Sequence, residues 1–432
     1  MPLARRDLRG APTGKAELTA LLPRPVDEQE RSSEVVAAIL AEVRADGDAA
    51  LRRYTARFDG VELDELSVSL EECRAALERI PNELRTALEV AAERIRAYHA
   101  HEADRPAPDF DSEGISVRHL IRPVQRAGCY APGGRARYPS TVLMCAVPAR
   151  VAGVEEVVLC VPPGPEGRID DATLAAAAVA GVDEVYAVGG AQAIAAMAYG
   201  TESIGAVDVI VGPGNRFVAE AKRQVSGVVG VASAFAGPSE VVVIAGPETP
   251  PGLAAIDLVV QAEHGPDGSA WLITWSEDVA DAVEAEVDAI VAASPRRGDL
   301  EATLGSGGYV VLVDGPEQAC AVSDVIAPEH LELLVDGAEA LLEHIHSAGA
   351  VFLGVDAPAS IGDYLAGPNH VLPTNRTARF SSALRVDDFR KHIHAVTVGA
   401  DAVRSLGAHV VILAETEGLP AHAESVRRRW VP

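Results

Sequence analysis

The sequence predicts an α/β protein with two lobes built on parallel sheets, a helical N-terminal region and a small C-terminal tail. The 432 residues exceed the roughly 250 to 300 at which a single hydrophobic core stops growing, so more than one lobe is expected. After residue 130, short β-branched runs alternate with Ala-rich helical segments, which is the pattern of βαβ units around a parallel sheet.

Helical periodicity dominates the N-terminal third. Apolar residues recur at helical spacing over residues 27–58, with Gly47 and Gly60 as breaks, and a second helical stretch covers 82–101. The polar, Pro-rich segment 102–111 then predicts a loop or the start of a new lobe.

The expected strands follow in chain order. They cover residues 156–161, 184–188, 207–211, 240–244, 270–275, 309–313 and 350–353. Segment 367–388 is rich in Gly, Pro, Asn, Thr and Ser and is expected to form a long loop. The chain ends in a short helix over 421–429, whose arginines near its C-terminus complement the helix dipole.

Composition excludes several classes of function. A net charge of −26 would repel a phosphate backbone, so no nucleic-acid partner is expected. No run of about 18 apolar residues predicts a membrane span, and no apolar core follows the first residues as in a secretory signal. The cysteines are scattered and odd in number, which indicates reduced thiols and a cytoplasmic protein; they are Cys73, Cys129, Cys145, Cys160 and Cys320.

Two glycine-containing turns are candidates for phosphate binding, although the GxGxxG fingerprint of Rossmann-like lobes is absent. Gly189 and Gly190 follow one expected strand, and Gly212-Pro-Gly-Asn215 follows another. Backbone N–H groups at such a helix start suit a phosphate, but most strand-to-helix connections have the same form. From the spacing alone, both interpretations remain open.

Two short polar motifs are candidates for chemistry. Gln261 and His264 are three residues apart, so on a helix they share one face and could hold a metal, or simply form a polar helix end. Pro328 is expected to begin a helix, with Glu329 favoured in its first turn by the dipole. The same dipole would keep His330 a neutral base near pH 7. Adjacent helical side chains diverge, so the pair would serve different protons.

The remaining polar candidates lie near the long loop and the C-terminus. Asp363 immediately precedes the loop and His370 lies within it, where function and a structural hydrogen bond are both reasonable. Glu417 and His422 flank the last helix and, by themselves, are typical of a helix start and an exposed side chain.

Taken together, these segments resemble the histidinol dehydrogenase family from about residue 30 to the C-terminus. Conspicuous matches are Tyr-Ala-Pro-Gly-Gly at 130–134, Gly-Gly-Ala-Gln at 189–192, Gly-Pro-Gly-Asn at 212–215 and Gly-Pro-Ser-Glu at 237–240. Others are Gln-Ala-Glu-His-Gly at 261–265, Pro-Glu-His-Leu at 328–331, Gly-Asp-Tyr at 362–364, and segments 369–374 and 417–422.

The resemblance implies a role for each matched residue. It implies one Zn²⁺ per subunit held by Gln261, His264, Asp363 and His422. It implies Glu329 and His330 as the acid-base pair, and NAD contacts by Tyr130, Gln192 and Asn215. Substrate binding would involve Ser239, His370 and Glu417, together with the metal ligands and His330.

The implied reaction is the four-electron oxidation of L-histidinol to L-histidine through a bound aldehyde, with two NAD reduced, at the end of histidine biosynthesis. The implied assembly is a homodimer whose C-terminal tails, carrying Glu417 and His422, complete the partner's site. The leading alternative is a paralogue that oxidises another alcohol, such as a sulfonated diol, with the same zinc and Glu-His chemistry. A non-catalytic relative that binds zinc or a nucleotide is a third hypothesis, against which the retained motif residues argue.

The resemblance also implies domain boundaries. It divides the chain into an N-terminal arm (1–25), a discontinuous first lobe (26–128 and 239–381), an NAD-binding second lobe (129–238) and a dimerisation tail (382–432).

Several residues depart from the family pattern. Asn375 and Arg376 replace common glycines, and Ala359 replaces a Glu that can meet the substrate amine. The other departures are Ser233, Gly246, Ala383 and Arg385. Because these changes surround the pocket and spare the metal and acid-base residues, the reaction type is better determined than the substrate.

Overall fold

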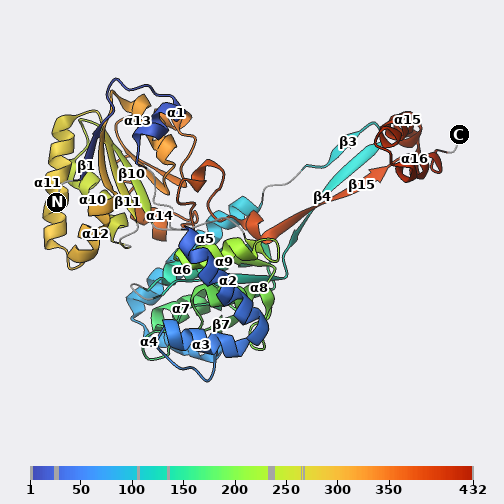
Figure 1. The fold of residues 1–432 in the computed structure, drawn as a ribbon, viewed down its shortest axis with the longest axis horizontal. Helices are drawn as coiled ribbons and strands as arrows, with labels where there is room; N and C mark the ends of the chain where they lie inside the picture. Colours follow the sequence, from blue (N-terminus) through green and yellow to red (C-terminus); the bar gives the residue numbers. More distant parts are fainter. Residues whose placement is uncertain are drawn as a thin grey trace.

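The computed structural model describes residues 3–23, 29–104, 108–133, 137–231, 239–263, 265 and 268–430. The described residues form two six-stranded sheets and one three-stranded sheet. Each six-stranded sheet lies at the centre of one α/β lobe, and the third sheet runs away from both as an arm (Figure 1). The expectation of two α/β lobes is therefore confirmed.

One lobe, which carries the residues expected to contact NAD and is therefore called the dinucleotide-side lobe below, has the strand order β2-β7-β6-β5-β8-β9. Its strands are β2 (Ser67–Val68), β5 (Arg126–Tyr130), β6 (Glu156–Cys160), β7 (Glu184–Tyr186), β8 (Val209–Val211) and β9 (Gly230–Val231). Its crossover helices are α6 (Pro139–Ala152), α7 (Asp171–Ala180), α8 (Gly190–Tyr199) and α9 (Arg216–Val225). All pairs are parallel except β2 with β7.

The N-terminal helices cover this same sheet. They are α2 (Gln29–Asp46), α3 (Asp48–Phe58), α4 (Leu70–Arg79) and α5 (Asn82–Ala103). The expected break at Gly47 separates α2 from α3, and its φ of 54° suits a glycine. Helices α4 and α5 pack with α6 and α7 on one face, and α2 and α3 pack with α8 and α9 on the other.

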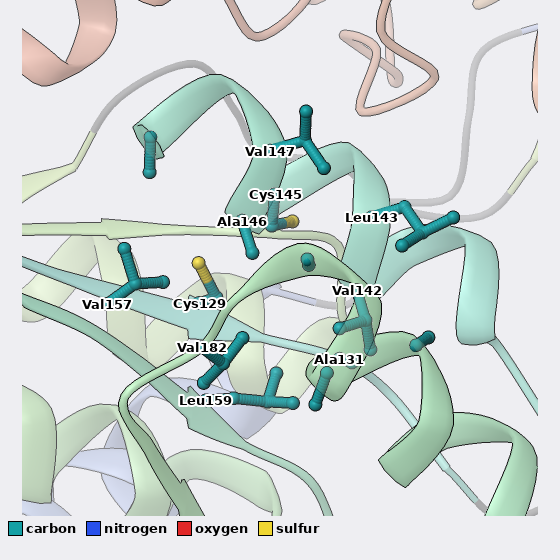
Figure 2. Packing of buried hydrophobic residues seen from close by; sticks show 14 of the residues in the cluster. Cys129, Ala131, Val142, Leu143, Cys145, Ala146, Val147, Val157, Leu159 and Val182 are labelled. Carbon is teal, nitrogen blue, oxygen red and sulfur yellow. The ribbon is translucent and has the colours of Figure 1, made fainter. Parts of the chain in front are cut away.

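The core between α6 and the sheet consists of small and β-branched side chains. Figure 2 shows Val142, Cys145 and Ala146 of α6 near Cys129 of β5 and Leu159 of β6. All five side chains are buried, so the helix approaches the sheet closely and fixes the strand ends that form the turns above it.

The other lobe, called the acid-base lobe below, has the strand order β1-β12-β11-β10-β13-β14, all parallel. Its strands are β1 (Ala4–Asp7), β10 (Glu240–Ala245), β11 (Ser269–Thr274), β12 (Gly308–Leu312), β13 (His330–Leu334) and β14 (Ala350–Leu353). Its helices are α1 (Lys15–Leu21), α10 (Pro251–Ala262), α11 (Glu277–Ala293), α12 (Arg297–Gly307), α13 (Pro316–Ile326), the 3₁₀ helix η1 (Ala338–His344) and α14 (Ala359–Tyr364).

Two expected groupings differ from the packing. Residues 4–7 are not a separate arm, because β1 pairs with β12 at the edge of the acid-base lobe. Residues 29–103 were expected with residues 239–381, but their apolar faces are buried against the dinucleotide-side sheet. The amphipathic pattern marks the face of each helix that is buried, and it does not identify the sheet that covers that face.

The long segment before the arm contains only short 3₁₀ turns among its described residues, as expected for a loop. These are η2 (Thr377–Arg379) and η3 (Val386–Phe389). The arm itself is a sheet of β3 (Phe110–Ser112), β4 (Ile115–Pro123) and β15 (Arg390–Val398), followed by α15 (Ala400–Thr416) and α16 (Pro420–Arg427). In Figure 1 the arm carries α15 and α16 far from both lobes. No helix among the described residues is long and apolar enough to cross a membrane.

Candidate active site

Glu329 and His330 lie at the start of a strand, so the expectation of a helix beginning at Pro328 is wrong. Ala327 ends α13 in the left-handed region at φ 50°, and the chain then enters β13 at His330. Pro328 disfavours helical backbone in the residue before it, which is consistent with a turn here. The sharp turn directs the pair into the first residues of a buried parallel strand.

The backbone of Glu240, at the start of the neighbouring β10, holds both side chains. Its N–H donates to Glu329 Oε2 at 3.0 Å, and its carbonyl oxygen accepts from His330 Nδ1 at 3.2 Å. The Glu329 carboxylate also lies 3.5 Å from His330 Nδ1. The residues are therefore fixed against a rigid sheet edge and are buried, with exposed fractions of 8% and 3%.

His330 is more basic in this structure than a helix start would make it. Burial lowers its pKa, but the carboxylates of Glu329 and Asp363 outweigh burial and raise the pKa well above its usual value. Its Nε2 donates to Asp363 Oδ1 at 3.2 Å, so both ring nitrogens face acceptors. This geometry stabilises the protonated imidazole of His330. His330 can act as the predicted neutral base only when the Asp363 carboxylate no longer accepts a hydrogen bond from its Nε2.

Helix α14 brings Asp363 to this position through close packing. A Cβ at Gly362 would lie 2.5 Å from the ring of Phe352, so only glycine allows α14 to approach that ring. Phe352 in turn stacks on His330, with ring centroids 6.0 Å apart. The Gly362-Asp363 sequence therefore sets the distance between the Asp363 carboxylate and the imidazole.

His370 connects the two lobes at this point. Its Nδ1 donates to the Asp363 carbonyl oxygen at 2.8 Å, and its Nε2 lies 3.3 Å from Thr141 Oγ1 on α6. Burial lowers its pKa. Since α6 belongs to the dinucleotide-side lobe, the group of Glu329, His330, Asp363 and His370 lies where the lobes meet.

Gln261 is the most unusual of the expected metal ligands. It is 1% exposed near the end of α10, and neither its amide oxygen nor its amide nitrogen has a hydrogen-bond partner among the described residues. Such an orphaned buried amide is costly unless a ligand satisfies it. Glu263, two residues further along the chain, is one of the charges that raise the pKa of Tyr364, next to Asp363.

The other expected ligands do not join this group within the described part of one chain. His264 lies outside the described residues. Glu417 and His422 are exposed on the arm, at and beyond the end of α15, remote from both lobes in Figure 1. Accordingly, the described ranges contain no group of three or more His, Cys, Asp or Glu side chains arranged to hold a metal ion.

Two further residues lie beside the acid-base pair. Ser239, expected to bind substrate, immediately precedes β10 and its carbonyl accepts from Ser269. Glu240 itself was not assigned a role, yet its carboxyl is buried, accepts from the Asn375 N–H at 3.1 Å and has a second oxygen without a partner. Burial and the nearby Glu329 raise its pKa to about 8.

The family departures at Asn375 and Arg376 have a backbone explanation. Both residues adopt left-handed conformations, with φ of 52° and 64°. Glycine takes this conformation without strain, Asn tolerates it, and Arg does so at a cost. The backbone geometry at these two positions suits the glycines common in the family. Ser233, another departure, lies outside the described residues.

A cavity of about 1110 Å³ lies at the carboxyl ends of β5, β6, β7 and β8. From β5 the chain moves outward to β6 and β7 and then crosses back through α8 to β8 on the other side of β5, so the cavity occupies the switch point where α/β sheets bind ligands. Tyr130, Gln192 and Asn215, the three expected NAD contacts, all line it. The structure therefore brings together residues that are 85 positions apart in sequence.

Local hydrogen bonds shape this cavity. Tyr130 Oη accepts from the Gly190 N–H at 3.1 Å, and Asn215 Oδ1 caps α9 by accepting from Phe217 and Val218 N–H at 3.0 and 3.1 Å. Charged side chains of both signs line the wall, namely Arg137, Arg168, Asp59, Glu166, Asp170 and Asp171. Helix α6 begins two residues after Arg137, and its Thr141 Oγ1 lies 3.3 Å from His370 Nε2, so this wall lies near the acid-base lobe.

The histidinol dehydrogenase family model matches residues 22–430. The chain belongs to the histidinol dehydrogenase family. A histidinol dehydrogenase of Parasynechococcus marenigrum is 48% identical, over 98% of this chain and 97% of the relative. One of Neisseria gonorrhoeae is 46% identical, over 97% and 98% respectively. The crystal structure of histidinol dehydrogenase from Elizabethkingia anophelis superimposes with a TM-score of 0.92 at 36% identity, covering 99% of this chain and 98% of the other. The expectation of an oxidoreductase of this family is confirmed.

Three buried charged residues near these sites, Asp257, Glu332 and Lys222, were not among the candidates that the sequence indicated. Asp257 and Glu332 are buried carboxyls within apolar segments, at the centre of α10 and in β13. Lys222 is buried in α9 and donates to the Gly212 carbonyl, holding the turn that carries Asn215. In α10 and β13, a single acidic residue within an apolar run is the sequence feature that indicates such a buried group, because a buried charge needs a specific partner.

Proposed function

We propose that this protein oxidises L-histidinol to L-histidine in two successive NAD-linked steps, as the last part of histidine biosynthesis. The observation that carries the proposal is the pair Glu329 and His330, fixed by the Glu240 backbone at the meeting of the lobes, opposite a cavity of dinucleotide size. The names of relatives that align over nearly the whole chain support the choice of substrate.

The two side chains of the pair would act on different protons. His330, once Asp363 no longer accepts from Nε2, is a base that takes the substrate hydroxyl proton during the first oxidation. Glu329 is a hydrogen-bonded carboxylate that can accept a proton from the water added to the aldehyde before the second oxidation. When bound, NAD accepts a hydride in each oxidation. His370, held by Asp363 and Thr141, would orient the substrate where the lobes meet.

Gln261 and Asp363 fit a zinc site. The Gln261 amide is buried with no hydrogen-bond partner among the described residues, and the Asp363 carboxylate lies beside His330, so each side chain offers an oxygen donor acceptable to zinc. His264 and His422 would complete the ligand set. When bound, zinc orients the nitrogen atoms of the substrate and disfavours its protonated amine.

We infer that His422 and Glu417 serve the site of a second copy in a homodimer. Supporting this inference, the arm carries them away from their own lobes (Figure 1). The arm also exposes large apolar side chains that a partner could bury, namely Ile393, Val396, Val398, Val410, Ile412 and Leu413.

The deciding experiment follows NADH formation from L-histidinol with and without a chelator. The proposal expects two NADH per histidinol and loss of turnover after zinc removal. Bound zinc without turnover of histidinol would instead favour a paralogue that oxidises another alcohol. One NADH per histidinol, with free aldehyde released, would contradict the two-step reaction.

Two variants separate the proposed roles of the pair. His330→Asn should slow oxidation of the alcohol, whereas Glu329→Gln should slow conversion of added aldehyde more than conversion of alcohol. Equal losses at both steps for both variants would refute the division of roles.

A further inference from the structure

Glu332 is a carboxyl group buried behind the acid-base pair. It lies on β13 two residues after His330, so the two side chains leave the same face of the strand. Its exposed fraction is 0%, and its Oε1 accepts from the Ala359 N–H at 2.9 Å. Ala359 is the first residue of α14, the helix that carries Asp363 one turn later. One side chain therefore connects the His330 strand to the Asp363 helix.

The same carboxyl connects to a third element. Asp257, in the centre of α10, is close enough to Glu332 for the two carboxyls to hydrogen-bond when one of them is protonated, and Gln261 follows Asp257 by four residues on the same face of that helix. A hydrogen bond between two carboxyl groups requires that one of them carry a proton. Burial and the nearby Asp257 raise the pKa of Glu332 to about 9, so Glu332 is the group that holds this proton at neutral pH.

Packing alone does not account for this pair. Two buried acidic side chains within apolar layers are less favourable than apolar side chains of similar volume. Leu258 and Leu334, which belong to the apolar cluster on the Glu332 face of the sheet, are buried and would pack against such replacements. An apolar side chain in place of Glu332 could neither accept from the Ala359 N–H of α14 nor hydrogen-bond to Asp257 of α10.

We propose that Glu332, with Asp257, is a positioning residue that fixes the mutual distances of His330, Gln261 and Asp363. The proposal rests on the proposed function for its activity readout. It assigns no contact with substrate to either carboxyl. The orientation of the three site residues is set through their backbone elements, β13, α10 and α14.

The test compares two replacements of Glu332. Glu332→Gln keeps an oxygen to accept from Ala359 and adds an N–H₂ that donates to Asp257, so the connection survives. Glu332→Met keeps the volume and removes both hydrogen bonds. Supporting groups behind metal ligands typically change affinity or activity by about 10- to 100-fold when lost. Glu332→Met should therefore lower kcat and zinc affinity by about 10-fold or more, and Glu332→Gln should stay within about threefold of the parent protein. The KM for NAD should not change in either variant.

Thr249→Val is the matched control. Thr249 is buried near the other end of β13, where its hydroxyl donates to the Leu334 carbonyl and accepts from the Gly246 N–H. Its replacement also removes two buried hydrogen bonds, one of them to β13 at the opposite end of that strand from His330. Glu332→Met should lower the melting temperature because it leaves the buried Ala359 N–H without an acceptor. Thr249→Val should lower it for the same kind of reason, but it should leave kcat and zinc affinity unchanged.

Hydrogen exchange provides a readout that does not depend on the substrate. Glu332→Met should speed amide exchange over residues 359–364, because the Ala359 N–H loses its acceptor. If the parent protein does not turn over histidinol, the proposed function fails, while exchange and zinc competition still test the positioning role. Unchanged exchange in α14, or equal kinetic losses for the Gln and Met variants, would overturn it.

Discussion

Asn215 combines two roles that mutation can separate. Its side-chain oxygen caps α9 by accepting from two backbone N–H groups, and its amide lines the proposed NAD cavity. Loss of an N-cap costs about 1 kcal/mol, within a range of about 0.5 to 2. For a lobe of this size, 1 kcal/mol lowers the melting temperature by about 2 to 4 °C. Asn215→Ala should show this loss together with weaker NAD binding.

Asn215→Asp should separate the two effects. A carboxylate caps a helix as well as an amide does and is favoured by the helix dipole, so the melting temperature should remain within about 1 °C. The same charge would repel the pyrophosphate, so the Kd for NAD should rise about 10-fold or more, equivalent to at least about 1.4 kcal/mol. Melting is followed by circular dichroism, and NAD binding by titration calorimetry.

Ser69→Ala is the matched control in the same lobe. Ser69 caps α4 by accepting from the Glu72 N–H at 3.1 Å, and it does not line the cavity. It should lower the melting temperature as Asn215→Ala does and leave the Kd for NAD unchanged. The reasoning is refuted if Asn215→Asp melts as early as Asn215→Ala, or if Ser69→Ala weakens NAD binding.

Three other predictions follow from particular contacts. Gly212→Ala would place a Cβ 2.0 Å from the Tyr130 carbonyl oxygen, so it should lower both melting temperature and NAD affinity. Gly227→Ala, at a similar φ of 100° with nothing within 4 Å, should show only the smaller backbone cost, and equal losses would contradict the steric argument. Burial raises the pKa of Asp59 in the cavity wall to about 6, so its stabilising contribution is complete below pH 4 and lost as the pH rises through 6. Asp59→Asn should therefore melt higher than the parent protein at pH 8, with the difference vanishing toward pH 4; a constant difference would exclude titration of Asp59 as the cause. A chain ending at Gly399 keeps the pairing of β4 with β15 but loses His422. It should fold and, in a metal analysis, contain less zinc than the full chain. Full zinc occupancy in this shortened chain would refute the shared site.

The periodicity of the sequence determined the secondary structure well. The break at Gly47, the parallel strands and the long loop appear where composition and turn residues indicated them. These features depend on local backbone preferences and on which side of an element is apolar, and both can be read from neighbouring residues. The start of β13 is one exception, because the proline and carboxylate that typify a helix start also suit a turn into a strand. The strands β4, β5 and β15 were also not among those expected.

The sequence motifs identified the candidate site residues, but the tertiary structure decided which of them lie close together. Glu329, His330, Asp363 and His370 gather where the lobes join, whereas His422 remains on the arm. The neutral His330 expected from a helix dipole gave way to a cation-stabilising environment, because Asp363 approaches from another element. Electrostatic effects of this kind depend on distances between segments that are far apart in the chain.

Only the tertiary structure identified the supporting groups. Asp257 and Glu332 are single charges in apolar segments, and nothing in either segment names its partner. The sheet that covers the N-terminal helices was equally undetermined, because an apolar face can be buried by any complementary surface. The sequence alone thus determined the elements and the chemically active residue types. Long-range packing decided their pairing, protonation and support, since those depend on the few ångströms that separate neighbouring elements.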